Sequence, residues 1–212
     1  MYEEKNDDVE TNIKVTLIGN SGVGKTCIIK RYMDKSFDPE STSTPGASYF
    51  QKFLKINEKN VQLDIWDTAG QEQYRSLGKH FYKDAFIVCL VYDITSYDSF
   101  SDLKKWFSDL KEFGEKYTIT AVVGNKSDCF ENEEVKEEEA RTFAKNMESS
   151  FFLVSAKNGD GIEELFSSLV KIYLGPEFIE KVRLTITDKG KTEKIVKEQK
   201  DSKGKKKKKN HC

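Results

Sequence analysis

The chain has 212 residues, of which 37% are hydrophobic and 33% are charged, and this length suits one domain with an appendage. The net charge of −1 is unevenly distributed: residues 1–177 carry 22 basic and 31 acidic side chains, whereas residues 178–212 carry 13 and five. An acidic body with a basic tail predicts that the tail seeks an anionic surface. The acidic N-terminus has no apolar stretch, and the longest apolar run, residues 85–92, is too short to cross a bilayer. Neither a signal peptide nor a membrane-spanning helix is therefore expected.

The predicted elements alternate between strand and helix along the chain. Apolar runs and alternating patterns predict six strands, over residues 15–18, 49–56, 61–66, 85–92, 119–123 and 151–154. Apolar side chains at helical spacing predict helices that include residues 25–32, 100–110, 140–147 and 165–169. Residues 37–46 are rich in Ser, Thr, Pro and Gly and are predicted to form a long loop. Asp160 and Glu163 have the spacing of a capping box before the last helix.

This order of elements predicts an α/β fold with three layers. A mostly parallel six-stranded sheet is expected, with helices on both faces, and ligands bind such sheets beyond the carboxyl ends of the strands. From residue 175 onward the apolar periodicity fades and lysine increases. We therefore expect a flexible acidic N-terminus at 1–12, a folded domain at 13–174 and a disordered basic tail at 175–212.

The octet GNSGVGKT at residues 19–26 is the most informative motif in the chain. It follows a predicted strand and opens a predicted helix, which is the context of a loop that wraps nucleotide phosphates. Glycines let the backbone turn its N–H groups toward an anion, and the helix N-terminus adds unpaired donors. Lys25 is expected to reach the β- and γ-phosphates and Thr26 to ligate Mg²⁺. The alternative is a glycine-rich turn ahead of a helix.

The heptad WDTAGQE at residues 66–72 supplies candidates for metal binding and hydrolysis. Asp67 ends a predicted strand, where a carboxylate can hold Mg²⁺ directly or through water. Gly70 is expected to place its backbone N–H at the γ-phosphate, and Gln71 to orient the attacking water. Alone, an Asp in this position is more often a turn former.

Two further motifs predict the base. NKSD, residues 125–128, follows a predicted strand, and the carboxylate of Asp128 offers acceptors for the two adjacent donors of guanine. Adenine has no such donor pair and would leave this carboxylate unpaired, so GTP is favoured over ATP. Ser155, Ala156 and Lys157 form the second motif, in which the Ala156 N–H is expected near guanine O6. The alkyl stems of Lys126 and Lys157 are expected to pack against the base.

In this order, the four motifs resemble those of small Ras-like GTPases over residues 13–174. Within that superfamily the chain most resembles the Rab branch, on the basis of Trp66, Tyr74-Arg75-Ser76-Leu77, Phe81-Tyr82 and the segment VYDIT at 91–95. The stretches STSTPGASYF and WDTAGQEQYRSLG are closest to endosomal-type Rabs. The resemblance implies a P-loop GTPase domain that binds GTP, GDP and Mg²⁺ and acts as a switch in vesicle trafficking.

The resemblance also assigns roles to residues. It implies Mg²⁺ ligands at Thr26, Thr44 and Asp67, with Thr42 as a competitor of Thr44, and catalytic roles for Gln71 and Lys25. It implies nucleotide contacts at Asn20, Ser21, Gly22, Val23, Gly24, Lys25, Thr26, Cys27, Phe37, Thr44, Gly70, Asn125, Lys126, Asp128, Ser155, Ala156 and Lys157.

Two residues depart from the family pattern. Pro45 stands where most Rabs have an aliphatic residue, and it lacks an N–H and biases Thr44 toward extended geometry. Ser21 stands where Ras proper has glycine, as is common in Rabs, and its side chain can restrict an arginine inserted by an activating protein. These departures keep open an alternative, a nucleotide-binding scaffold with little turnover. A P-loop kinase or ATPase is disfavoured by Asp128.

The tail and the cysteines predict partners and location. Lys205 to Lys209 precede the terminal Cys212, and the resemblance implies prenylation of Cys212, with the lysines as a second membrane signal. Exchange factors, GTPase-activating proteins, effectors and escort or GDP-dissociation-inhibitor proteins are the implied partners of a monomer. The four cysteines lack metal or redox spacing, which favours the cytosol. We therefore expect a peripheral protein on the cytosolic face of endomembranes that does not bind nucleic acid.

Overall fold

The computed structural model describes residues 11–40, 44, 46–56, 58–68, 81–177 and 179. The chain divides into two units, residues 1–172 and 173–212. The elements that build the functional site belong to the first unit, and of the second unit only residues 173–177 and 179 are described. None of the helices in these ranges combines the length and the apolarity that a membrane crossing requires.

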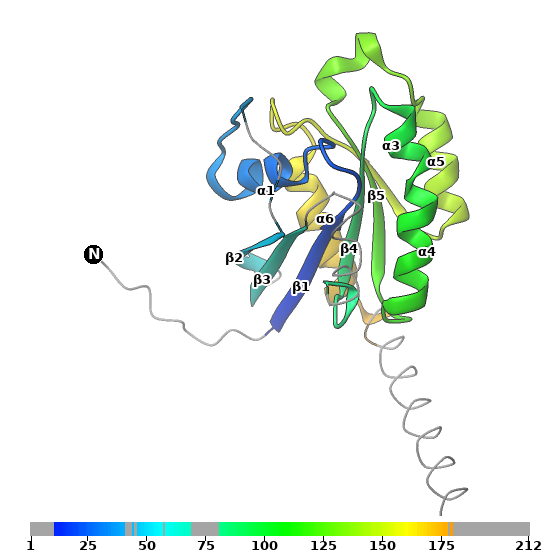
Figure 1. Cartoon of the computed structure of the whole chain (residues 1–212). Helices are drawn as coiled ribbons and strands as arrows, with labels where there is room; N and C mark the ends of the chain where they lie inside the picture. Colours follow the sequence, from blue (N-terminus) through cyan, green and yellow to red (C-terminus); the bar gives the residue numbers. More distant parts are fainter. Residues whose placement is uncertain are drawn as a thin grey trace, which may run out of the picture. The chain divides into compact units, whose positions relative to one another are not determined.

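A six-stranded sheet forms the centre of the first unit (Figure 1). Its strands are β1 (Thr11–Ile18), β2 (Ala47–Ile56), β3 (Lys59–Thr68), β4 (Ile87–Asp93), β5 (Ile119–Asn125) and β6 (Ser150–Leu153). Their order is β2-β3-β1-β4-β5-β6, with β2 antiparallel to β3 and the other neighbours parallel. In the register of the sheet, Val15 lies opposite Ile65 on one side and Ile87 on the other. The predicted α/β class and mostly parallel sheet are confirmed.

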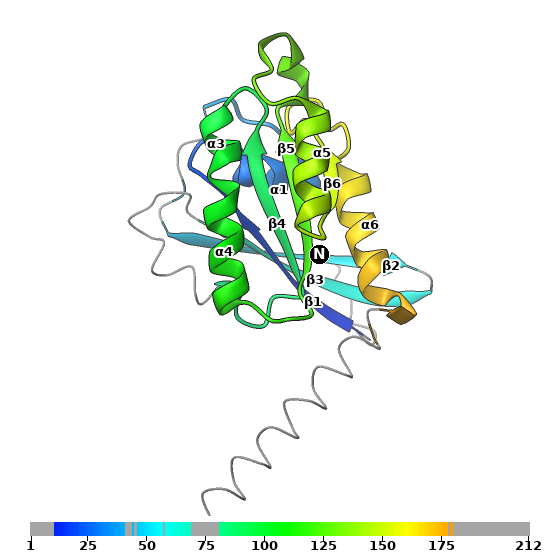
Figure 2. The ribbon, with the colours of Figure 1, turned by 90° about the vertical axis from the view of Figure 1, so that its right-hand side faces the viewer.

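Helices cover both faces of this sheet (Figures 1 and 2). The described helices are α1 (Lys25–Asp34), α3 (Tyr97–Ser101), α4 (Leu103–Phe113), α5 (Glu137–Asn146) and α6 (Ile162–Leu174), with a 3-10 helix, η2, at Ser127–Asn132. Helices α3, α4 and α5 pack on one face, where their apolar side chains join those of β4 and β5 in one core cluster. Helices α1 and α6 lie on the other face and meet where the rings of Tyr32 and Phe166 stack at 3.9 Å.

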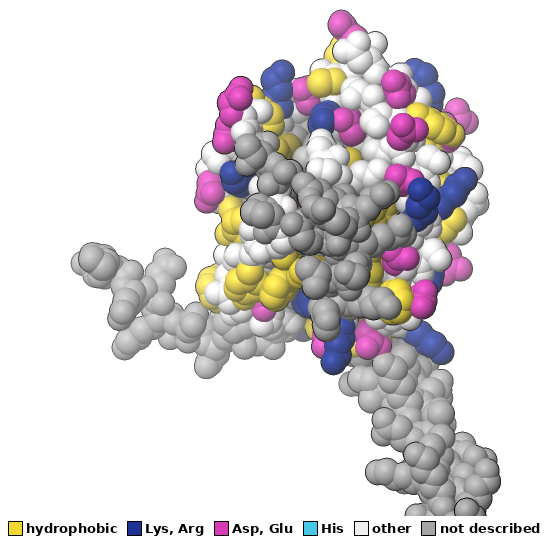
Figure 3. Space-filling model, viewed as in Figure 1, with side chains coloured by type: hydrophobic (Ala, Val, Ile, Leu, Met, Phe, Trp, Pro, Cys, Tyr) yellow, Lys and Arg dark blue, Asp and Glu magenta, His cyan; other side chains and the backbone are white. Residues whose placement is uncertain are grey.

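The central strand β4 shows why the sheet is buried. All seven of its residues are buried, as expected of a continuous apolar run that is covered on both faces. Full burial of a Val or Leu side chain contributes about 1.5–3 kcal/mol relative to leaving it exposed. The edge strand β2 is different, because every second residue is exposed. Figure 3 shows hydrophobic side chains over β2 and β3, where Tyr49 and Phe53 are 45% and 54% exposed.

Three local predictions need correction. Strand β1 begins at Thr11 rather than at Val15, because its polar first half pairs with β3. The helix predicted over 100–110 is two helices, α3 and α4, which meet at Asp102. The capping box is wrong: α6 begins at Ile162, so Gly161 precedes it, and the carboxylate of Glu163 binds Lys35 instead.

Candidate functional site

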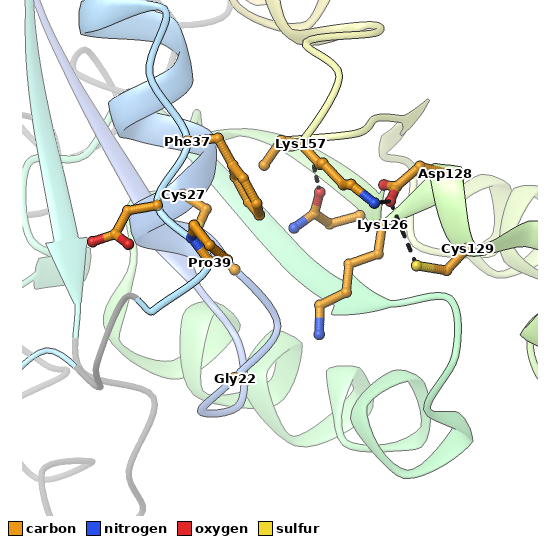
Figure 4. A pocket seen from close by; sticks show the side chains of 12 residues that line it. Gly22, Cys27, Phe37, Pro39, Lys126, Asp128, Cys129 and Lys157 are labelled. Atoms are coloured by element: carbon orange, nitrogen blue, oxygen red, sulfur yellow. Dashed lines mark hydrogen bonds and ion pairs between the residues drawn. The ribbon is translucent and has the colours of Figure 1, made fainter.

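The predicted motifs meet at the carboxyl ends of the parallel strands. The phosphate loop follows β1, Asp67 lies near the end of β3, NKSD begins at the last residue of β5, and Ser155 follows β6. A cavity of about 400 Å³ opens between them (Figure 4). The residues that line it are Gly22, Gly24, Cys27, Phe37, Asp38, Pro39, Asn125, Lys126, Asp128, Cys129, Ala156 and Lys157.

The glycines of the phosphate loop are required by close approaches. A Cβ on Gly24 would lie 2.3 Å from the Asn125 side-chain nitrogen, and one on Gly19 would lie 2.1 Å from the Val91 carbonyl oxygen. Both glycines have positive φ, +92° for Gly24 and +141° for Gly19, which other residues adopt only with strain. Helix α1 begins at Lys25, so its unpaired N–H groups lie where the loop ends. This end of the cavity therefore has the construction of an anion site.

Lys25 is held at the phosphate loop by the loop itself. Its ammonium is buried and donates hydrogen bonds to the carbonyl oxygens of Gly19 at 2.8 Å and Asn20 at 2.9 Å. Burial lowers the pKa of Lys25 to about 8, and the charge of Asp67 partly offsets this effect. At neutral pH the side chain is still predominantly protonated, so it presents a partly desolvated cation to an incoming phosphate.

Three oxygen-bearing side chains converge beside Lys25. The Thr26 and Thr44 hydroxyls lie 2.7 and 3.2 Å from the same carboxylate oxygen of Asp67, and 2.8 Å from each other. Asp67 is fully buried, and its other carboxylate oxygen has no hydrogen-bond partner among the described residues. Burial raises the pKa of Asp67, against the opposing effects of the Thr26 hydrogen bond and the Lys25 charge. A buried carboxylate with an unused oxygen beside two hydroxyls fits a hard divalent cation such as Mg²⁺.

Asp128 lies at the other end of the cavity. One of its carboxylate oxygens accepts a hydrogen bond from the Ser155 hydroxyl at 2.6 Å, and the other lies 3.7 Å from the Lys157 ammonium. Partial burial acts to raise the pKa of Asp128, but the hydrogen bond from Ser155, further local hydrogen bonds and the charge of Lys157 together hold it below its usual value. The side chain is therefore an ionised acceptor at neutral pH.

Asn125 ties the two ends of the cavity together. Its side-chain nitrogen donates to the Val23 carbonyl oxygen at 2.8 Å, and its side-chain oxygen accepts from the Ala156 N–H at 3.2 Å. The N–H that was predicted to face guanine O6 therefore already has a protein acceptor, which a base would have to share. Asn125 fixes the phosphate loop against the segment that follows β6.

Phe37, Lys126 and Lys157 flank the space between these ends (Figure 4). The Lys126 ammonium pairs with Asp93 at 2.5 Å, which leaves its alkyl stem to border the cavity. Asp93 is mostly buried and also accepts hydrogen bonds from the N–H and hydroxyl of Thr95. An aromatic ring and aliphatic stems around this space suit a planar ring system.

Not every predicted residue reaches the cavity. The Asn20 side chain turns away and bonds Asp102 and Trp106 of the α4 region, and the exposed Ser21 is not part of the lining. The lining also does not include Lys25, Thr26, Thr44, Asp67 or Ser155. The side chain of Val23 is buried, so only its carbonyl takes part, through Asn125. Thr42, Pro45, Gly70, Gln71 and Cys212 lie outside the described residues.

Other lining residues were not predicted. Asp38 and Pro39 follow Phe37, and Cys129 follows Asp128, so their adjacency to motif residues is the signal that could have found them. Two residues outside the lining also contact the site, Arg31 through the Ala156 carbonyl oxygen and Asp93 through the Lys126 ammonium. The sequence contains no comparable signal for either, because each contact joins segments that are distant in the chain.

Comparison with known proteins shows which family the chain resembles. Residues 14–175 match the model of the Ras family. The chain is 39% identical to the Ras-related protein Rab-30 of Homo sapiens over 163 residues, which are 77% of this chain and 80% of the relative. It is 40% identical to Rab-22A of Homo sapiens over 154 residues, 73% and 79% of the two chains. It is 37% identical to Rab-2B of Dictyostelium discoideum over 164 residues, 77% and 81% of the two chains.

Proposed function

Because the chain belongs to the Ras family, and within it to the Rab branch of small GTPases, we propose that its cavity holds guanine nucleotide together with Mg²⁺ through the residues described above. As a Rab-like GTPase, the protein binds guanine nucleotide, hydrolyses GTP and acts in membrane trafficking. The observation that carries the proposal is the presence of two different chemistries in one site. Three converging side-chain oxygens that suit a hard cation lie at one end, and an ionised acceptor lies at the other.

The phosphate and metal end uses Gly22, Gly24, Lys25 and the α1 N-terminus for the phosphates, and Thr26, Thr44 and Asp67 for Mg²⁺. The side-chain oxygens of the last three lie within hydrogen-bond distance of one another, so one ion can reach all of them. When bound, the ion neutralises charge on the β- and γ-phosphate oxygens. Thr44 belongs to the loop after α1. Its place at this end of the site depends on whether the γ-phosphate and the ion are bound, and this dependence makes the loop a switch.

The base end selects guanine. Asp128 accepts from the two adjacent donors of guanine, and Ser155 and Lys157 keep its carboxylate oriented and ionised. Phe37 and the stems of Lys126 and Lys157 cover the ring. An adenine ring would leave the carboxylate without donors, which is costly in a partly buried site.

Hydrolysis is assigned to Gln71, which would orient water, with Lys25 and the Gly70 N–H stabilising charge on the γ-phosphate. Unassisted turnover in this class is on the order of 10⁻⁴ to 10⁻³ s⁻¹. The reaction is therefore a timer: effectors bind the GTP state, exchange factors restore it, and activating proteins end it.

The tail is the proposed route to the membrane. Prenylation of Cys212 by a Rab-type transferase with an escort protein would supply an apolar anchor. Lys205 to Lys209 would each add roughly 1 kcal/mol of attraction to an anionic leaflet. The protein would then act as a monomer at the cytosolic face of endomembranes.

The first test is the identity of the nucleotide that copurifies with the protein. The protein is purified with Mg²⁺ kept present and then denatured, and the supernatant is separated by ion-exchange chromatography. Stoichiometric GDP is expected, because bound GTP is cleaved during purification. Stoichiometric GTP would keep the guanine site but contradict turnover, and the absence of guanine nucleotide would overturn the proposal. Single-turnover cleavage of GTP should also be lost in Gln71→Leu, and equal rates would contradict the role of Gln71.

A further inference from the structure

Arg31 of helix α1 contacts the segment that follows β6. Its Nε donates to the Ala156 carbonyl oxygen at 2.8 Å, and one terminal nitrogen donates to the Lys157 carbonyl oxygen. The other terminal nitrogen donates to the Lys35 carbonyl oxygen at 2.6 Å, at the end of the same helix. One guanidinium therefore joins the C-terminus of α1 to two consecutive carbonyl groups of the base end.

The N–H and side-chain groups of this segment have other partners. The Ala156 N–H donates to Asn125, the Ser155 N–H donates to the Asp160 carbonyl, and the Ser155 hydroxyl donates to Asp128. Arg31 donates to the carbonyl oxygens of both Ala156 and Lys157. Ala156 is only 3% exposed, so its carbonyl has little access to water, and losing a donor there is costly.

The position of Arg31 on α1 gives these contacts a functional meaning. The helix begins with Lys25 and Thr26 at the phosphate and metal end, and Arg31 lies less than two turns later. An α-helix is rigid over this length, so α1 fixes how far the base end lies from the phosphate end. The helix end is itself anchored, because the Lys35 ammonium binds Glu163 at the start of α6.

We propose that Arg31 is a positioning residue for guanine recognition: it holds Ala156 and Lys157 where the base must meet them, and thereby slows nucleotide release. This inference rests on the proposed guanine site. Arginine suits the role because its planar fork offers five N–H donors in fixed directions, whereas lysine has one ammonium on a flexible stem. Arg31 touches neither the phosphates nor the metal end, so it should affect release and leave cleavage unchanged.

The test compares Arg31→Ala and Arg31→Lys with a matched control, Arg141→Ala. Arg141 also pairs through its side chain, with Glu137 on α5, and its guanidinium lies over the ring of Phe151 on β6, but it is not part of the cavity lining. Release of a fluorescent GDP analogue is followed in Mg²⁺ after adding excess GDP. We expect release from Arg31→Ala to be about tenfold faster than from wild type, with Arg31→Lys intermediate and Arg141→Ala unchanged.

Two further measurements separate positioning from a general loss of structure. Single-turnover cleavage of prebound GTP should keep the wild-type rate in both Arg31 variants. Hydrogen exchange in the GDP-bound protein should increase in the peptide covering residues 155–158, and this comparison can be made with Arg31→Lys if the alanine variant does not fold. Wild-type release rates in the Arg31 variants, or cleavage that slows as release speeds up, would overturn the inference alone. A wild-type protein without guanine nucleotide would overturn the proposed function as well.

Discussion

The indole nitrogen of Trp106 donates a hydrogen bond to the side-chain oxygen of Asn20 at 2.8 Å. The Asn20 side-chain nitrogen in turn donates to Asp102 at 2.8 Å, and its backbone carbonyl accepts from the Lys25 ammonium at 2.9 Å. Asn20 thus connects helix α4 to Lys25, the proposed phosphate ligand. The phosphate loop is held from outside the nucleotide site as well as by its own glycines.

Replacing Asn20 with Ala should loosen the phosphate loop. The change removes one hydrogen bond to an indole and one to a carboxylate, and we expect the free energy of unfolding to fall by about 2 kcal/mol. GDP release should also be faster, because the carbonyl that holds Lys25 is less firmly placed. Urea unfolding and release kinetics measure the two effects, with Asn146→Ala at an exposed position as the control. Wild-type values for both would show that the link to α4 does not support the loop.

The sequence motifs predicted the fold and the family correctly. Strand and helix alternation, together with the octet at 19–26, predicted an α/β sheet with the site at its carboxyl edge, and the fold and the family are confirmed. These features follow from local spacing: glycines, a lysine and a hydroxyl must be near neighbours in the chain to wrap a phosphate. The convergence of Thr26, Thr44 and Asp67 agrees with the roles that the resemblance implied.

Residues whose partners are distant in the chain were not predictable in the same way. Asn20 belongs to the octet, so it was expected to contact nucleotide, but its side-chain partners lie 82 and 86 residues away. Arg31 is 125 residues from Ala156, and in the sequence it is one more basic residue of a helix. The capping box failed because α6 begins at Ile162, one residue later than a box at Asp160 requires, and the Glu163 carboxylate lies against Lys35. In each case packing between elements, rather than local pattern, decides the contact.

Removing the Asp67 carboxylate should abolish the effect of Mg²⁺ on nucleotide release. In wild type, chelation of Mg²⁺ should accelerate GDP release, because Thr26, Thr44 and Asp67 would hold the ion that neutralises phosphate charge. Asp67→Ala should release GDP quickly with or without chelator.

The matched control for this experiment is Asp64→Ala. Asp64 lies on the same strand and accepts hydrogen bonds from Tyr49 and Gln62 on the other side of the strand. Its loss should leave the chelator response intact. A full response to chelator in Asp67→Ala would contradict the assignment of Asp67 to the metal.

The lowered pKa of Lys25 predicts how nucleotide affinity depends on pH. The ammonium has a pKa of about 8 in the nucleotide-free fold and an ordinary value of 10.5, and only the charged form attracts phosphate. Below pH 8 the titration of Lys25 should not change the affinity for GDP, and above pH 8 this affinity should fall by up to about tenfold per pH unit. Titration calorimetry between pH 7 and 9.5 measures the slope.

The same shift makes a prediction for stability, with the opposite sign. Between pH 8 and 10.5 the unfolded chain binds more protons at Lys25 than the nucleotide-free fold does, so the penalty for burying this group shrinks as pH rises. Lys25→Arg stays charged over this range and is the control both for GDP affinity and for the free energy of unfolding. In the affinity measurement it also corrects for titration of the guanine base. The same pH dependence in this variant and in wild type would show that another group is responsible.

Asp128 should determine which base the site accepts. An Asn side chain presents one acceptor and one donor, and this donor would face the 2-amino group of guanine but would match the 2-carbonyl oxygen of xanthine. We therefore expect Asp128→Asn to bind GDP about 100-fold more weakly than wild type does, and to prefer xanthosine diphosphate. Asp160→Asn, at an exposed position near the same segment, should keep the preference for GDP. Competition between the two nucleotides gives the ratio directly, and an unchanged ratio in Asp128→Asn would mean that guanine is recognised by other groups.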